Sequence, residues 1–285
     1  PPEMLTAGQR LVKAGFDLWT MVLIGLAGPG EKSRSHALDT AALINAMGPR
    51  HLSALTYLPT PGTPLARQAE RSIDLDGLLE LARSAPPLEY EPVRLPRFDR
   101  PVRIAVARDR AFCFYYEDSL AALTELGAEL VPFSPLADPA LPEEIHGLYL
   151  GGGYPELYAP ALSENASLRA AIRAAVEGGL PCIAECGGFM YLLDAIGDHP
   201  MAGAIPGRSF DAGKLTRFGY VTLTAQKDNL LCRAGEQIPA HEFHHWDAEA
   251  PGEDFLAEKP SGRSWPCAHA SKTLYAGFPH FHFYA

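Results

Sequence analysis

The sequence lacks the cysteine and charge patterns that are typical of zinc modules, disulfide scaffolds and nucleic-acid-binding proteins. Its five cysteines are an odd number with no C-x-x-C pair, and no secretory signal is present, so we expect a reduced, cytoplasmic protein. No block of Lys or Arg occurs, and 24 Lys and Arg against 34 Asp and Glu leave a net charge of −10. Such a chain repels phosphate backbones, which argues against nucleic-acid binding.

Long apolar runs are also missing. The longest candidate, residues 18–27, is about half of the ~18 residues that a membrane-spanning helix needs, and it ends at Gly28 and Pro29. The chain does contain ample apolar material for packing, since 47% of its 285 residues are hydrophobic. This length corresponds to about two domains, and we expect no membrane partner.

Residues 1–70 are expected to form an incomplete βαβ segment. Helical patterns cover residues 4–14 and 36–47, and apolar runs that fit buried strands cover 19–26 and 52–58. Strand, helix and strand in this order predict one parallel crossover unit, which needs neighbours to cover it. Residues 71–100 are predicted to be a linker, because the stretch from Ser84 to Pro101 carries five prolines, at 86, 87, 92, 96 and 101.

Residues 101–285 are expected to form a second domain of α/β class. Strands and helices alternate along it, which predicts a mostly parallel sheet with helices on both faces. Beyond Pro206 the pattern becomes β-rich. The strands are predicted at 102–107, 128–133, 147–150, 180–184, 220–224 and 242–246, and the helices at 118–126, 163–177 and 189–196.

Cys186 stands where a predicted strand turns sharply into a predicted helix. Two glycines follow it, and strand, tight turn and helix are the context of a nucleophile elbow. The N–H dipoles of the helix would favour a thiolate there. The alternative is a buried cysteine that only packs, which is the commonest role of a free cysteine.

Two further features would complete a thiol-dependent site. The glycines 151–153 follow another strand, so both loops lie beyond the carboxyl ends of the sheet, where ligands bind. Their N–H groups could stabilise an oxyanion, although a glycine triplet is also compatible with an ordinary flexible loop. At the C-terminus, His280 and His282 are predicted to share one face of an extended segment. Either could act as the base for a thiol, or be a surface histidine, and spacing alone does not choose between them.

Two apparent motifs are rejected on physical grounds. Residues 241–245 spell H-E-x-x-H, but prolines flank them and no helical apolar stripe is present. In a strand the two histidines would lie roughly 13 Å apart, too far to share one zinc, so we expect no metal site. Residues 25–33 nearly spell a phosphate-binding loop, but Glu31 follows the last glycine where the lysine should stand.

Residues 72–285 resemble the C-terminal part of the cobyrinate a,c-diamide synthase family, including its glutaminase domain. The resemblance implies a class I glutamine amidotransferase fold, glutamine as a partner and Cys186 as the nucleophile. By position, His280 matches the catalytic histidine. In the mechanism that we infer, N–H groups of Gly152 or Gly153, together with Gly187, hold the oxyanion. The matching stretches are 111–118, 148–156, 184–191, 217–220, 241–244 and 280–283.

Many class I amidotransferases carry a glutamate two residues after the catalytic histidine. Here that place holds His282, so the resemblance implies a Cys–His pair. The implied function is the release of ammonia from glutamine for the ATP-dependent amidation of corrinoid carboxylates in cobalamin biosynthesis. The alternative is a non-catalytic fusion remnant or binding module of the same fold.

The glutaminase step is expected to need no cofactor. ATP and Mg²⁺ belong to the synthetase domain of the parent enzyme, whose phosphate loop the sequence does not contain, and a corrinoid acceptor is expected only with that domain. The sequence is compatible with a homodimer and does not fix the oligomeric state.

Residues 11–68 resemble the last part of a radical S-adenosylmethionine barrel, in stretches 21–30, 36–45 and 61–65. No cysteine precedes Cys113, so we expect no iron–sulfur cluster. The join near residue 70 resembles a gene fusion or an assembly chimera, and a start at Pro1 is consistent with a fragment.

Overall fold

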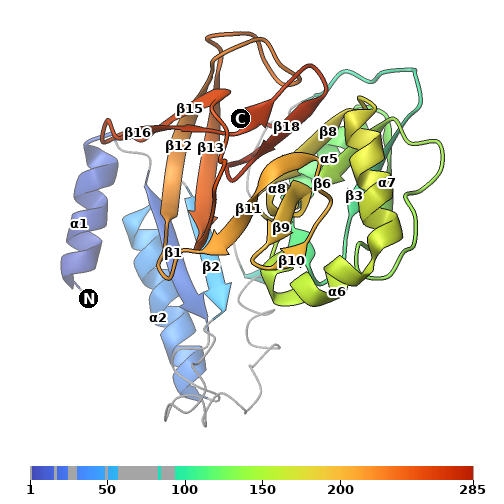
Figure 1. The fold of residues 1–285 in the computed structure, drawn as a ribbon. Coiled ribbons are helices and arrows are strands. Elements are labelled where there is room, and N and C mark those ends of the chain that lie inside the picture. The colour runs from blue at the N-terminus through green and yellow to red at the C-terminus, as the bar shows by residue number, and fades with distance from the viewer. Residues whose placement is uncertain are drawn as a thin grey trace. The chain divides into compact units, whose positions relative to one another are not determined.

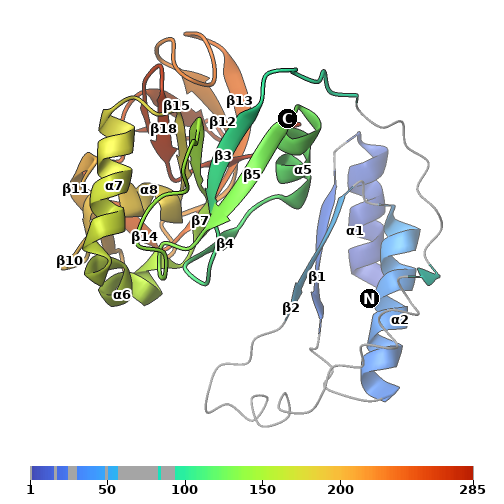
Figure 2. The same cartoon turned by 90° about the vertical axis from the view of Figure 1, so that its right-hand side faces the viewer.

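The computed structural model describes residues 2–15, 18–24, 31–48, 51–56, 83–84 and 94–284. The chain divides into two units, Pro1–Pro92 and Val93–Ala285 (Figures 1 and 2). The division falls within residues 71–100, most of which lie outside the described residues, as do residues 25–30 of the apparent phosphate-binding loop. The assignment of these segments as domains and linker stays a prediction.

The first unit contains the crossover that the sequence predicts. Strands β1 and β2 pair in parallel, with Trp19 opposite His51, and helix α2 connects them. The elements are α1 (Pro2–Lys13), β1 (Trp19–Ile24), α2 (Glu31–Met47) and β2 (His51–Thr56).

The second unit is built on a six-stranded sheet with the order β17-β18-β8-β6-β3-β5. Five of the strands run parallel and β17 alone is antiparallel to its neighbour, so the predicted mostly parallel sheet is confirmed. The strands are β3 (Val102–Ala107), β5 (Ala128–Phe133), β6 (Gly147–Leu150), β8 (Cys182–Glu185), β17 (His269–Ala270) and β18 (Leu274–Gly277).

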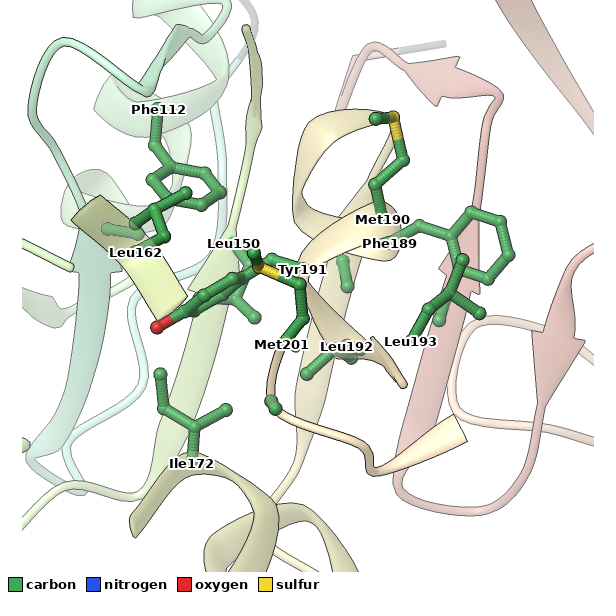
Figure 3. Packing of buried hydrophobic residues seen from close by; sticks show 14 of the residues in the cluster. Phe112, Leu150, Leu162, Ile172, Phe189, Met190, Tyr191, Leu192, Leu193 and Met201 are labelled. Atoms are coloured by element: carbon green, nitrogen blue, oxygen red, sulfur yellow. The ribbon is translucent and has the colours of Figure 1, made fainter. Parts of the chain in front are cut away.

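Both faces of this sheet are covered, because its side chains alternate between two apolar clusters. Ala105, Leu150 and Ala184 point into the larger cluster with α6 (Ala159–Glu164), α7 (Ala166–Glu177) and α8 (Gly187–Leu192). Val106 and Tyr149 face the other side, where α5 (Glu117–Glu125) packs. Figure 2 shows α7 and α5 on opposite sides of β3 and β5, and Figure 3 shows the α8 side chains within the larger cluster.

Smaller sheets, some antiparallel and one mixed, complete the unit. A five-stranded sheet with the order β16-β15-β12-β13-β19 lies on the α5 side, where its apolar residues meet Ile183 and Tyr275 of the main sheet. Its strands are β12 (Arg217–Ala225), β13 (Gln237–His244), β15 (Phe255–Glu258), β16 (Ser264–Cys267) and β19 (His280–Phe281). A four-stranded sheet contains β9 (Leu193–Ile196), β10 (His199–Pro200), β11 (Ile205–Asp211) and β14 (Trp246–Ala248). A two-stranded sheet contains β4 (Phe112–Phe114) and β7 (Gly152–Gly153), and a 3-10 turn follows at Pro155–Tyr158.

Two predicted helices differ from the structure. The helix predicted at 163–177 is divided at Asn165, whose side-chain amide donates hydrogen bonds to the carbonyls of Pro135 and Asp138. The helix predicted at 189–196 ends at Leu192, because the residues that follow pair in parallel with β11. Both corrections come from partners that are distant in the sequence.

Gly188 is required by the close approach of α8 to β6. A Cβ atom at Gly188 would lie 2.0 Å from the carbonyl oxygen of Leu150, whereas at Gly147 the nearest atom would lie 3.6 Å away. We expect Gly188→Ala to lower the free energy of unfolding by about 1–3 kcal/mol through overpacking. Gly147→Ala, the control, should lower it by less, because the added Cβ would meet its nearest neighbour at an ordinary van der Waals distance. Urea unfolding of both variants checks this, and equal losses would contradict it.

Candidate active site

Cys186 occupies a strained turn between β8 and α8. Its backbone angles are φ 49° and ψ −101°, a region that is costly for a residue with a Cβ and that is found mainly at functional sites. Hydrogen bonds hold the turn from both sides. The N–H of Cys186 donates to Gly277 O at 2.7 Å and the N–H of Gly188 donates to Gly151 O at 3.0 Å. Only 8% of the residue is exposed, so Cys186 is buried.

His280 lies in β19 and is buried beside this turn. Its Nδ1 lies 3.1 Å from Oε2 of Glu185, and the ring of Phe114 packs against it with centroids 4.8 Å apart. Burial by itself would lower the pKa of His280. The hydrogen bonding and charge of Cys186 and Glu185 outweigh burial and raise that pKa from 6.5 to about 10. Cys186, His280 and Glu185 therefore form one interacting group.

The glycine loop closes the other side of this group. A Cβ atom at Gly152 would lie 2.6 Å from Cε1 of His280, and one at Gly187 would lie 3.1 Å from the nitrogen of Gly153. Gly153 has a φ of 154°, and a Cβ there would lie 2.1 Å from Ala111 O, so only glycine fits this close approach. The structure brings together Cys186, His280 and the three glycines, and their roles stay predictions.

The second imidazole of the C-terminal segment has different surroundings. Strand β19 ends at Phe281, and Nε2 of His282 lies 2.7 Å from Oδ2 of Asp118 in a pair whose side chains are 36% and 60% exposed. The ring also packs edge-on against Tyr116. Glu185 and Cys186 therefore meet His280, while His282 pairs with Asp118 at the surface.

Sequence reasoning missed Glu185. This residue is 1% exposed, and its Oε2 also accepts a hydrogen bond of 3.3 Å from the hydroxyl of Tyr149. Burial, followed by the charge of Glu185, raises the pKa of Tyr149 well above 10, so the phenol keeps its proton. The available signal was an ionisable residue at the end of an apolar strand, because buried carboxylates are rare unless they are paired.

The H-E-x-x-H residues adopt the strand conformation that the sequence predicts. They lie in and just after β13, where His241 is the register partner of His280. His244 stacks on Phe278 with centroids 3.9 Å apart, and burial raises the pKa of Glu242 to about 7. Within the described part of the chain, no group of three or more His, Cys, Asp and Glu side chains is placed to hold a metal ion.

The fold and the site together define a class of protein. A nucleophile elbow at the edge of a parallel α/β sheet, with an imidazole from the C-terminus and adjoining glycine loops, is suited to thiol-dependent attack on an amide. Residues 103–285 match the family model of the CobB/CobQ-like glutamine amidotransferase domain. The chain belongs to this family, and its second unit is a glutamine amidotransferase domain.

Curated relatives are named cobyrinate a,c-diamide synthase. The protein of this name from Caldanaerobacter subterraneus subsp. tengcongensis is 41% identical over 248 residues, which cover 82% of this chain and 55% of the relative. The one from Dehalococcoides mccartyi is 47% identical over 189 residues, covering 63% and 41%. This chain spans about half the length of such relatives. The resemblance of residues 11–68 to a radical S-adenosylmethionine barrel stays a prediction.

A solved structure of PurLQS from Thermotoga maritima is similar at a TM-score of 0.45 and 17% identity, covering 63% of this chain and 87% of that one. This likeness is too weak to carry functional meaning. Among the described residues, no helix is both long and apolar enough to cross a membrane.

The raised pKa of His280 predicts a ring that stays protonated through neutral pH and loses its proton near pH 10. Because the pKa is raised above 6.5, the protonated ring stabilises the fold fully below about pH 6.5, and this contribution is lost as the pH rises through about 10. We expect ¹⁵N NMR of the ring to show this titration. Cys186→Ala should lower the pKa of His280, and Cys232→Ala, the control, should not. A wild-type ring that is neutral at pH 8 would contradict the assignment.

Proposed function

We propose that this protein hydrolyses glutamine to glutamate and ammonia, with Cys186 as nucleophile and His280 as its base. The observation that carries the proposal is the strained turn that holds Cys186 beside a buried histidine whose pKa depends on that cysteine. A cysteine that served only for packing would gain nothing from a strained backbone or from an ionisable neighbour.

The reaction follows from these positions. His280 holds the thiol proton of Cys186 at neutral pH, in keeping with its raised pKa, and Sγ attacks the side-chain carbonyl carbon of glutamine. The N–H groups of Gly152 or Gly153 and of Gly187 hold the resulting oxyanion. His280 returns the proton to the nitrogen as the C–N bond breaks, and ammonia leaves. Water, activated by the same histidine, then attacks the thioester and releases glutamate.

We also propose that the ammonia serves the amidation of a corrinoid carboxylate, as in cobalamin biosynthesis. The support is the name that the relatives carry, cobyrinate a,c-diamide synthase, together with their sequence identity to this chain. The amidation step is expected to use ATP and Mg²⁺. That step, and the corrinoid partner, would belong to a synthetase domain.

A reducing, cytoplasmic location is part of the proposal. All five cysteines are free thiols, and the reaction needs the thiol of Cys186 reduced.

Glutamine hydrolysis by wild-type protein and by Cys186→Ala tests the proposal. Glutamate release, measured by a coupled dehydrogenase assay, should fall to background in Cys186→Ala and by roughly 10²-fold or more in His280→Asn, because the base is lost. Cys232→Ala, with a partly exposed thiol outside the site, should keep wild-type activity. Equal background release by all four proteins would support the non-catalytic remnant instead.

A further inference from the structure

We propose that Glu185 is the positioning residue for His280. Its carboxylate would accept the Nδ1–H of the ring, leave Nε2 free for the thiol proton of Cys186, and balance the positive charge that the ring gains. This inference rests on the proposed glutaminase function and deepens it.

The geometry of the pair supports this role. Glu185 Oε2 and His280 Nδ1 are 3.1 Å apart, and the two side chains are 2% and 6% exposed. In such a buried setting, a charge-assisted hydrogen bond is stronger than the same contact at the surface. By contrast, the carboxylate of Asp118 pairs with His282 in an exposed position. Glu185 is therefore the carboxylate that can act on the ring facing Cys186.

The chemistry of the pair assigns the tautomer. An ionised carboxylate only accepts hydrogen bonds, so the hydrogen of this bond must be on Nδ1. The other ring nitrogen, Nε2, is then the atom that can take the thiol proton. When it does so, the ring becomes an imidazolium with Glu185 already beside it, so no solvent reorganisation is needed.

The backbone explains how two consecutive residues reach one ring. Side chains of neighbouring residues in a strand point to opposite faces. Cys186 leaves the strand with a φ of 49°, so its thiol and the carboxylate of Glu185 both approach His280. On the neighbouring strand, Gly277 pairs with Glu185, and His280 follows three residues later.

Stability alone does not account for a carboxylate at this place. Oε1 of Glu185 is buried and has no hydrogen-bond partner among the described residues, and an unmet buried acceptor lowers the stability of the folded state. Removing one partner of a buried charged pair leaves the other charge uncompensated and lowers stability. Both a structural role and a positioning role therefore predict a less stable Glu185→Gln protein, and only a positioning role predicts a loss of kcat in the protein that remains folded.

Glu185→Gln in the full chain is the test, with Glu242→Gln as a matched buried control. We expect Glu185→Gln to lower kcat for glutamine by roughly 10²-fold or more, within the range of general acid–base effects, with KM changed less than about threefold. The pKa of His280, followed by ¹⁵N NMR, should fall. The urea midpoint should fall too, because removing one partner of a buried charged pair is destabilising, so kcat is measured per folded protein. Glu185→Asp keeps the negative charge, so its kcat should lie between those of wild type and Glu185→Gln. Glu242→Gln should match wild type in kcat and in the His280 titration.

The proposal is overturned if Glu185→Gln keeps wild-type kcat and an unchanged His280 titration, or loses activity only in proportion to lost folding. Failure of glutaminase activity in wild type would overturn the proposed function instead, and the His280 titration would still test Glu185. If Glu185→Gln does not fold, the His280 titration in Cys186→Ala tests the role of Glu185. With the sulfur of Cys186 removed and Glu185 kept, the pKa of His280 should remain above 6.5, and a value at or below 6.5 would refute the role.

Discussion

The candidate site depends on the parallel pairing of β8 between β6 and β18. Leu148 and Leu274 are both register partners of Cys182, so the three strands end at nearly the same level. The glycine loop after β6, the turn after β8 and the C-terminal segment after β18 leave the sheet at one edge, where α/β proteins bind their ligands. This register brings His280 to Glu185 across 95 residues of sequence.

Small residues allow this edge to be tightly packed. Gly188 lets α8 approach the Leu150 carbonyl, and Gly153 lets its loop approach Ala111. Because α8 begins directly after the strained Cys186, its six fully or nearly buried residues anchor the turn in the core. The unfavourable backbone conformation at Cys186 is thereby offset by packing elsewhere.

The electrostatics of the site are those of a buried charged group. Cys186 and Glu185 raise the pKa of His280 against the effect of burial, while Tyr149 donates to the same carboxylate oxygen. Burying such groups opposes folding. The proposed chemistry at Cys186 would account for their arrangement, and residues 103–285 belong to a glutamine amidotransferase family.

Features set by interactions between residues close in the sequence are predicted well, and features set by contacts between distant residues are not. Strand and helix periods predict β3, β5 and β6 at their observed residues. The division of a helix at Asn165 and the strand at Leu193–Ile196 escape prediction, because each is set by partners far along the chain. Spacing treats His280 and His282 alike, and only the family resemblance favours His280.

By itself, the sequence determined the α/β alternation and the sharp turn at Cys186, because periodicity and glycine placement act over a few residues. Only the tertiary structure decided that Glu185 meets Nδ1 of His280 and that His282 turns to Asp118. Those contacts depend on the register of strands and on where β19 ends, and neither property is a local feature of the chain.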